Sequence, residues 1–164
     1  MDKQLILYFI EETLEGSDKM NTSIRRCMVS DAHRIHALCH EVLGYEFSEE
    51  QVEQNLRRLI GSTENLLLVA VDQEDEAIGF IHANNHDPIY APPMKDVVAL
   101  AVDPEYRNRG IGRRLLQAVE DWARETGAKG IRTNAAVSHK SALGFYKENG
   151  YEYIRTVYNI RKMF

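Results

Sequence analysis

Apolar and polar residues follow one another along the chain with two different periods. Alternation with a period of two is typical of strands, and apolar residues spaced three and four apart are typical of one helix face. The pattern predicts strands at 24–29, 66–71, 77–82, 97–102 and 131–135, further strand segments within 151–162, and helices at 30–44, 48–60, 110–126 and 138–149. This order of elements predicts a mixed α/β fold in which helices cover a sheet.

Residues 97–115 carry the clearest chemical signal. Val97 to Val102 are six consecutive apolar residues, which is typical of a strand buried on both faces. A short loop follows and opens an amphipathic helix at Gly110 and Gly112. Glycines there allow several backbone N–H groups to converge, and the positive end of the helix dipole adds to their field. We therefore predict an anion site suited to a pyrophosphate, with positive charge added by Arg107, Arg109, Arg113 and Arg114.

Two better known phosphate motifs do not fit these residues. The dinucleotide fingerprint GxGxxG needs a glycine where Leu115 stands. A P-loop needs glycine at 107 and lysine at 113, and both positions hold arginine. A tight strand-to-helix turn with solvated arginines remains the alternative if only the glycines are considered.

A second motif lies about thirty residues further on. Arg107-x-x-Gly110-x-Gly112, followed by Ala142-x-x-Phe145-Tyr146-x-x-x-Gly150-Tyr151, resembles the GNAT superfamily of N-acetyltransferases. The similarity covers residues 23–162 in element order. It implies a mixed, largely antiparallel sheet with helices on both faces and a splayed central strand pair. It also implies an enzyme that takes an acetyl group from acetyl-CoA.

The resemblance assigns coenzyme contacts to particular residues. The strand at Leu100, Ala101 and Val102 would pair with the pantetheine arm and polarise the thioester carbonyl. The pyrophosphate would lie on the loop and helix start formed by Arg107, Asn108, Arg109, Gly110, Ile111, Gly112 and Arg113. His139 stands where the family often has asparagine, and Asn134 on the preceding strand would lie near the acyl arm.

Tyr146 stands where many members of the family carry the acid that protonates the departing thiolate. A phenol with a pKa of about 10 stays protonated at neutral pH and can donate that proton. An attacking ammonium must also lose a proton, and Asp96 at the head of the central strand is our candidate base. Other candidates remain open: Glu41, His82, His86 and Asp87.

Composition limits the remaining possibilities. The chain has 164 residues, with 20 Lys and Arg against 25 Asp and Glu, so its formal charge of −5 argues against a nucleic-acid partner. We predict one catalytic domain at 22–164, preceded by an N-terminal extension at 1–21. The absence of a long apolar run and the lack of a cysteine framework predict a cytoplasmic protein with no membrane partner. Three histidines at near-helical spacing lack the further ligands that a metal site needs, so we predict no metal.

The recipient of the acetyl group stays open between a small molecule and a protein amine. The mechanism we expect is direct attack in a ternary complex, because no activated Cys or Ser is apparent. Acidic residues at 46, 49 and 50 would attract a cationic acceptor, although a capping box at Ser48 also accounts for two of them. A non-catalytic acyl-CoA sensor is the alternative function. The family often forms dimers, which makes a homodimer through 153–164 an expectation from analogy.

Overall fold

The computed structural model describes residues 22–164, and its elements follow the predicted order up to α5. The strands are β1 (Ser23–Arg26), β2 (Asn65–Val71), β3 (Ala77–His86), β4 (Met94–Val102) and β5 (Ile131–Thr133). The helices are the short η1 (Val29–Asp31) and η2 (Pro104–Tyr106), together with α2 (Ala32–Glu41), α3 (Glu49–Leu59), α4 (Ile111–Glu125) and α5 (Lys140–Glu148). The predicted extension at 1–21 lies outside the described residues.

The described chain divides into two compact units, one that ends at Thr133 and one that spans Asn134–Phe164. The first unit holds a five-stranded sheet in the order β1-β2-β3-β4-β5. The first three strand pairs are antiparallel and the β4–β5 pair is parallel. The prediction of a mixed, largely antiparallel sheet is therefore confirmed.

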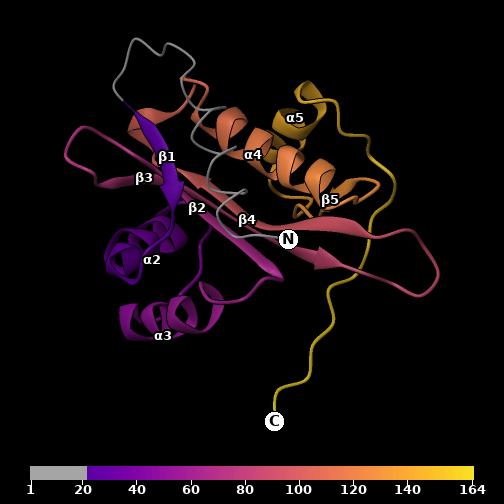
Figure 1. The fold of residues 1–164 in the computed structure, drawn as a ribbon, viewed down its shortest axis with the longest axis horizontal. Coiled ribbons are helices and arrows are strands. Elements are labelled where there is room, and N and C mark those ends of the chain that lie inside the picture. The colour runs from indigo at the N-terminus through magenta and orange to yellow at the C-terminus, as the bar shows by residue number, and fades with distance from the viewer. Residues whose placement is uncertain (1–21) are drawn as a thin grey trace. The chain divides into compact units, whose positions relative to one another are not determined.

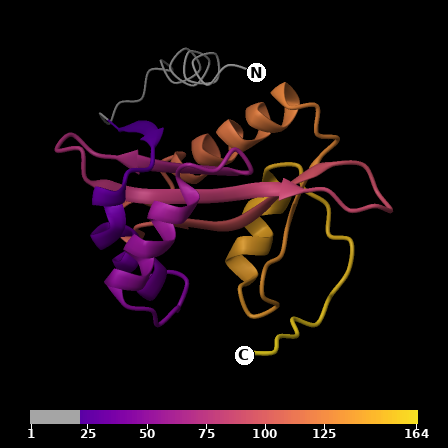
Figure 2. The same ribbon diagram turned by 60° about the horizontal axis from the view of Figure 1, so that its bottom comes forward.

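Helices cover both faces of this sheet, as the views in Figures 1 and 2 show. On one face α2 and α3 pack on a core that includes Ile35, Leu38, Leu56, Val69 and Phe80. On the other face α4 buries the side chains of Ile111, Leu115, Leu116, Val119 and Trp122. These buried residues have the three- and four-residue spacing from which the helix was predicted. Burial of this stripe holds the start of α4 beside the end of β4.

A buried ion pair fastens β1 to the start of α2. Asp31 is 6% exposed, and its carboxylate accepts hydrogen bonds of 2.9 Å from Nη1 and Nη2 of Arg25 and one of 2.7 Å from the Met28 amide. Burial alone would raise the pKa of Asp31, but these hydrogen bonds outweigh it and lower the pKa below its usual range. Asp75, which is 63% exposed, accepts a further bond from Nε of Arg25.

We expect Asp31→Asn to lower the free energy of unfolding by about 2 kcal/mol, because it leaves the half-buried Arg25 short of its counter-charge. The exposed partner offers a matched control, and Asp75→Asn should change stability by less than about 0.5 kcal/mol. Because the pKa of Asp31 is lowered on folding, its contribution is present above about pH 4 and is lost as the pH falls further. Urea unfolding at pH 7 and pH 3 tests this, and equal losses for the two variants would contradict it.

Two predictions about strands are wrong. The segment 151–162 contains no strand, because a strand needs a pairing partner and apolar content does not specify one. The β4 strand is not buried on both faces, since Val98 is 52% exposed. Val98 is the extra residue in a bulge, where the β3–β4 register shifts between His82 and Ala83.

Candidate functional site

The loop between β4 and α4 is shaped by two backbone positions. Asp103 directly follows β4, and its side chain accepts a hydrogen bond of 2.9 Å from the Glu105 amide at the start of η2. Asn108 has a φ of 60° and Gly110 a φ of 81°, so both lie in the left-handed region. Gly110 is the N-cap of α4, and a Cβ added there would meet nothing within 4 Å. The loop therefore leads the chain directly into the helix and leaves the space in front of Gly110 open.

The first turn of α4 presents backbone donors at this loop. The first amides of a helix have no acceptor within the helix, and the helix dipole makes this end positive. In α4 these are the amides of Ile111, Gly112 and Arg113, while the Arg114 amide already bonds to the Gly110 carbonyl. Such a helix start can hold a phosphate or pyrophosphate group.

The four arginines around this loop have different partners. Arg113 donates to Glu120 at 2.6 Å and to Gln117 at 2.7 Å, and Arg114 donates to Oγ1 of Thr22 at 2.9 Å. The guanidinium of Arg109 lies 5.3 Å from the Tyr106 ring centroid, and Nε of Arg107 donates to the Val102 carbonyl at 3.3 Å. Arg107 and Arg109 are exposed and contact residues of the loop region, whereas Arg113 and Arg114 contact residues outside it.

The β4 strand has an edge that β5 covers only in part. The β4–β5 register runs from Lys95 to Val97, whereas β4 continues to Val102. The Asp103 amide bonds to the Ile78 carbonyl of β3. In an antiparallel ladder every second residue of a strand bonds to the same neighbour, so Ala101 also faces β3. The N–H and C=O groups of the residues between them, Leu100 and Val102, therefore point away from β3, toward this edge. An extended ligand can add to such an edge through main-chain hydrogen bonds.

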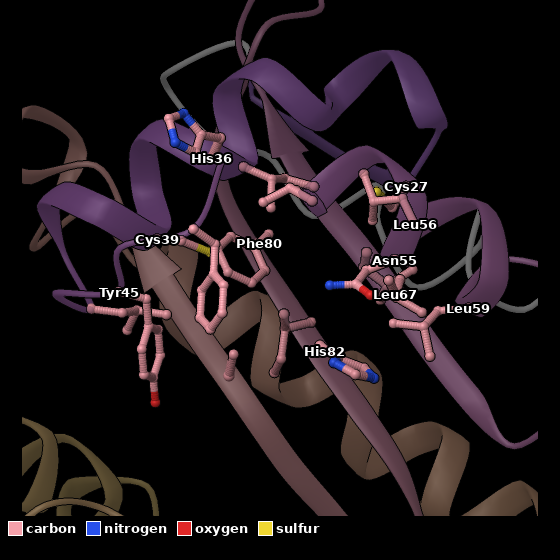
Figure 3. Close-up of a pocket in the computed structure, with 17 residues that line it drawn as sticks. Cys27, His36, Cys39, Tyr45, Asn55, Leu56, Leu59, Leu67, Phe80 and His82 are labelled. Atoms are coloured by element: carbon pink, nitrogen blue, oxygen red, sulfur yellow. The ribbon is translucent and has the colours of Figure 1, made fainter. Parts of the chain in front are cut away.

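A cavity of about 230 Å³ lies between the sheet and the two helices α2 and α3 (Figure 3). Its walls are mainly apolar and include Ile35, Leu56, Leu67 and Phe80. The polar or ionisable residues that line it are Cys27, His36, Cys39, Tyr45, Asn55 and His82. Ala99 forms its wall on β4, and Ala99 directly precedes Leu100. The cavity and the partly covered edge of β4 therefore meet within one residue of each other.

His82 is the one of our five candidate bases that lines this cavity. Its Nε2 lies 3.0 Å from Oδ1 of Asn65, whose Nδ2 in turn donates to Oγ of Ser62 at 3.1 Å. An amide oxygen only accepts, so Nε2 carries the proton and Nδ1 of the neutral ring is the basic nitrogen. Burial, with a smaller contribution from the Arg58 charge, lowers the pKa of His82 below its usual value. A neutral imidazole in this position can accept a proton.

The other candidate bases lie elsewhere. Asp96 has its carboxylate 3.7 Å from Nε of Arg132, and burial raises its pKa. His86 contacts Nη1 of Arg132 at 3.1 Å. Glu41 is exposed at the end of α2 and Asp87 is exposed after β3. None of these four side chains lines the cavity found in the described chain.

The second unit holds three of the predicted site residues. Tyr146 is buried in α5, and its ring packs edge-on against Phe145 and Tyr151, with centroid distances of 5.3 Å in both cases. His139 is the exposed N-cap residue of α5, and Asn134 is exposed just after β5.

Comparison with known proteins decides the family. The model described as the acetyltransferase (GNAT) family matches residues 19–151. The chain belongs to the GNAT acetyltransferase family. The predicted resemblance is thereby confirmed, and with it the prediction of an acetyl-CoA-dependent acetyltransferase.

Individual GNAT proteins show how far the similarity reaches. The chain is 30% identical to the uncharacterized N-acetyltransferase YhfO of Bacillus subtilis over 79% of this chain and 89% of that protein. It is 28% identical to the peptidyl-lysine N-acetyltransferase YjaB of Escherichia coli, over 81% of this chain and 84% of that one. The structure of the aminoglycoside N-acetyltransferase AAC(6')-Iy in complex with CoA matches with a TM-score of 0.78 and 18% identity, covering 90% of this chain and 98% of that chain. At 18% identity, the similarity to AAC(6')-Iy shows that the two chains share a fold.

Within this GNAT chain, several features of the site escaped sequence reasoning. The bulge at Val98 has no signal in an unbroken apolar run. Asn55, Asn65 and Tyr45 come from a helix, a strand and a loop whose polar residues look like solvated surface in the sequence. Residues 22–164 hold no group of three or more metal-type ligands, and the helices in this range are too short or too polar to cross a membrane.

Proposed function

We propose that this GNAT protein transfers the acetyl group of acetyl-CoA to a primary amine by direct attack in a ternary complex. The observation that carries the proposal is the meeting of three features in the first unit: the helix-start donors of α4, the partly covered edge of β4, and a cavity that begins at Ala99. The sequence relatives named as peptidyl-lysine and aminoglycoside N-acetyltransferases, each 28% identical to this chain, support an amine as the recipient.

The geometry of the loop fits the diphosphate of CoA. The amides of Gly110, Ile111, Gly112 and Arg113 would bind its oxygens, and the exposed side chains of Arg107 and Arg109 would add charge, with Asn108 holding the turn. A bound anion is stabilised both by hydrogen bonds from the helix-start amides and by the helix dipole, and the dipole alone typically contributes about 0.3–1 kcal/mol of binding free energy. Asn134 and His139 stay proposed coenzyme contacts on the ground of the family resemblance.

The pantetheine arm would extend along the strand segment Leu100–Val102. The main-chain groups of Leu100 and Val102 face this edge, so they can bond to the amides of the arm as an added strand would. An N–H group from the same segment would donate to the thioester carbonyl oxygen. A fixed donor aimed at an oxygen that gains charge is among the largest contributions to acyl transfer.

The thiols of this chain are poor nucleophiles, which supports direct attack. Burial raises the pKa of Cys27 to about 12, and burial also raises the pKa of Cys39. Both side chains therefore remain protonated at neutral pH, whereas acyl transfer through an enzyme cysteine needs the thiolate. The amine itself is the nucleophile that attacks the thioester.

Two proton transfers accompany the attack. We propose His82 as the base that takes a proton from the ammonium, in preference to Asp96, because His82 lines the cavity and its ring is neutral at pH 7. Tyr146 is proposed as the acid that protonates the leaving thiolate of CoA.

The binding part of the proposal has a direct test in the turn that starts α4. An alanine at Gly110 must adopt a φ near 80°, which costs about 1–2 kcal/mol and displaces the amides that face the loop. We expect Gly110→Ala to weaken CoA binding about tenfold in titration calorimetry. Gly127→Ala is a matched control, because Gly127 has a φ of 74° and equal space around it but lies after the other end of α4.

The control should lose similar stability in chemical unfolding while binding CoA as the parent chain does. An equal change of CoA affinity in both variants would show that the loop at Gly110 is not part of the CoA-binding site. Failure of the parent chain to bind CoA at all would overturn the proposal. Tight binding without acetylation of any amine, measured as release of free thiol, would favour the acyl-CoA sensor.

A further inference from the structure

The cavity between α2, α3 and the sheet differs from what a polycationic acceptor needs. None of its lining residues in the described chain is Asp or Glu, although the chain has 25 such residues. The acidic residues at the start of α3 are engaged elsewhere: Glu49 pairs with His33 at 2.9 Å, and Glu50 accepts from Gln54 at 3.3 Å. A multiply charged amine placed in this cavity would lose its hydration without gaining a counter-charge.

The size of the cavity sets the kind of group that it can hold. An engineered apolar cavity of about 150 Å³ is enough to bind benzene, and the space here is about 230 Å³. It therefore has room for one aromatic ring or a branched alkyl group together with a short linker. Phe80, Leu67 and Leu56 supply the apolar wall against which such a group packs.

The polar residues of the cavity are placed to receive the amine end. His82 pairs across the sheet with Ala99, and Ala99 is next to Leu100, whose main chain faces the partly covered edge. The exposed aromatic side chains of Tyr45 and Phe47 also line the cavity, with ring centroids 6.4 Å apart. An amine bound in the cavity would therefore have His82 and the partly covered edge of β4 along one wall and apolar side chains along the others.

We propose that the acceptor is a primary amine with one apolar body of about the size of an aromatic ring, and that this body occupies the cavity under α2 and α3. This inference rests on the proposed function and narrows its substrate class. It distinguishes this chain from enzymes that act on aminoglycosides or on diamines. The amine nitrogen attacks the thioester carbon, the C–S bond breaks, and the products are the N-acetylamine and the free thiol of CoA.

The test compares acceptors on the full chain by release of free thiol. The probes are 2-phenylethylamine, putrescine and kanamycin, at saturating acetyl-CoA. Burial of a ring of the size of a phenylalanine side chain predicts a kcat/KM at least tenfold higher for 2-phenylethylamine than for putrescine. Higher kcat/KM for putrescine or kanamycin would overturn the inference and leave the proposed acetyltransfer intact. If CoA binds and none of these amines nor a lysine peptide is acetylated, both proposals fail.

Two variants locate the binding site. Cys39→Leu adds side-chain volume inside the cavity. His40→Leu is the control, because His40 is exposed on the same helix α2 and does not line the cavity. We expect Cys39→Leu to raise the KM for 2-phenylethylamine about tenfold with CoA affinity unchanged, and the KM of the His40→Leu variant to stay close to that of the parent chain. An unchanged KM in a folded Cys39→Leu variant would place the acceptor elsewhere.

A carboxylate introduced into the cavity by substitution gives an independent test of where the acceptor binds. Asn55→Asp keeps the size of a lining side chain and adds the carboxylate that the cavity lacks. We expect the ratio of kcat/KM for 2-phenylethylamine over putrescine to fall at least fivefold in this variant. A ratio that stays at the parent value would contradict an acceptor bound against Asn55, and this readout does not depend on the folding of the Cys39→Leu variant.

Discussion

Tyr146→Phe is expected to lower kcat for amine acetylation by about a hundredfold while the Kd for CoA stays within twofold of the parent value. The reason is chemical. Attack by an amine expels the thiolate of CoA, and a positioned acid that protonates the leaving group contributes about 10²–10⁴ in rate. The substitution removes one oxygen and keeps the ring, which packs edge-on against Phe145 and Tyr151.

The control for this experiment comes from the same ring cluster. Tyr151→Phe also removes a hydroxyl next to Tyr146, so it reproduces any loss of packing or local polarity. We expect its kcat to stay within about threefold of the parent chain. Thiol release at saturating acetyl-CoA gives kcat, and calorimetry gives the CoA affinity. Equal losses of kcat in the two variants would assign Tyr146 to structure, and a large loss of CoA affinity would assign it to coenzyme binding.

His82→Gln is expected to lower kcat/KM for the amine by about a hundredfold at pH 7 and to change its pH dependence. A glutamine amide still donates to Oδ1 of Asn65, but it cannot take a proton from the ammonium. Because burial lowers the pKa of His82, the ring in the parent chain is neutral at pH 7 and becomes protonated only below about pH 6.5. The parent activity should therefore fall on the acid side of this pH, and that fall should be absent in the variant.

A neighbouring histidine on the same strand serves as the control. His86 contacts Arg132 and does not line the cavity, so His86→Gln should retain both the activity and the acid limb of the pH profile. Asp96→Asn tests the base that we first considered from the sequence. Loss of the acid limb in Asp96→Asn, with the limb retained in His82→Gln, would return the role of base to Asp96.

The two residues that we propose as proton carriers, Tyr146 and His82, differ in how far the sequence could identify them. Tyr146 lies in a motif, and the motif itself carries the assignment. The sequence did not single out His82 from the other polar residues near the predicted hairpin. The cavity that His82 lines is completed by α2 and α3, and sequence spacing does not show which face of the strand these helices cover. The hydrogen bond between His82 and Asn65 depends on the β2–β3 register, in which Leu67 lies opposite His82.

The sequence alone determined the elements as far as α5 and the order in which they follow. Their apolar spacing is a local property, and it has the same period in the chain as in the folded helix or strand. The glycine and arginine pattern before α4 was also enough to predict the anion site that we propose, because the amides that would form it belong to one short loop. The family followed from this loop and from the later motif around Tyr146.

The tertiary structure alone decided the features that depend on long-range pairing. These are the bulge at Val98, the length of β4 beyond β5, the absence of a strand in 151–164 and the cavity beneath α2 and α3. Burial of Lys95, whose Nζ lies 3.7 Å from the Trp122 ring centroid, is a further example. Register and packing involve residues that are far apart in the chain, and local apolar spacing does not encode which of them meet.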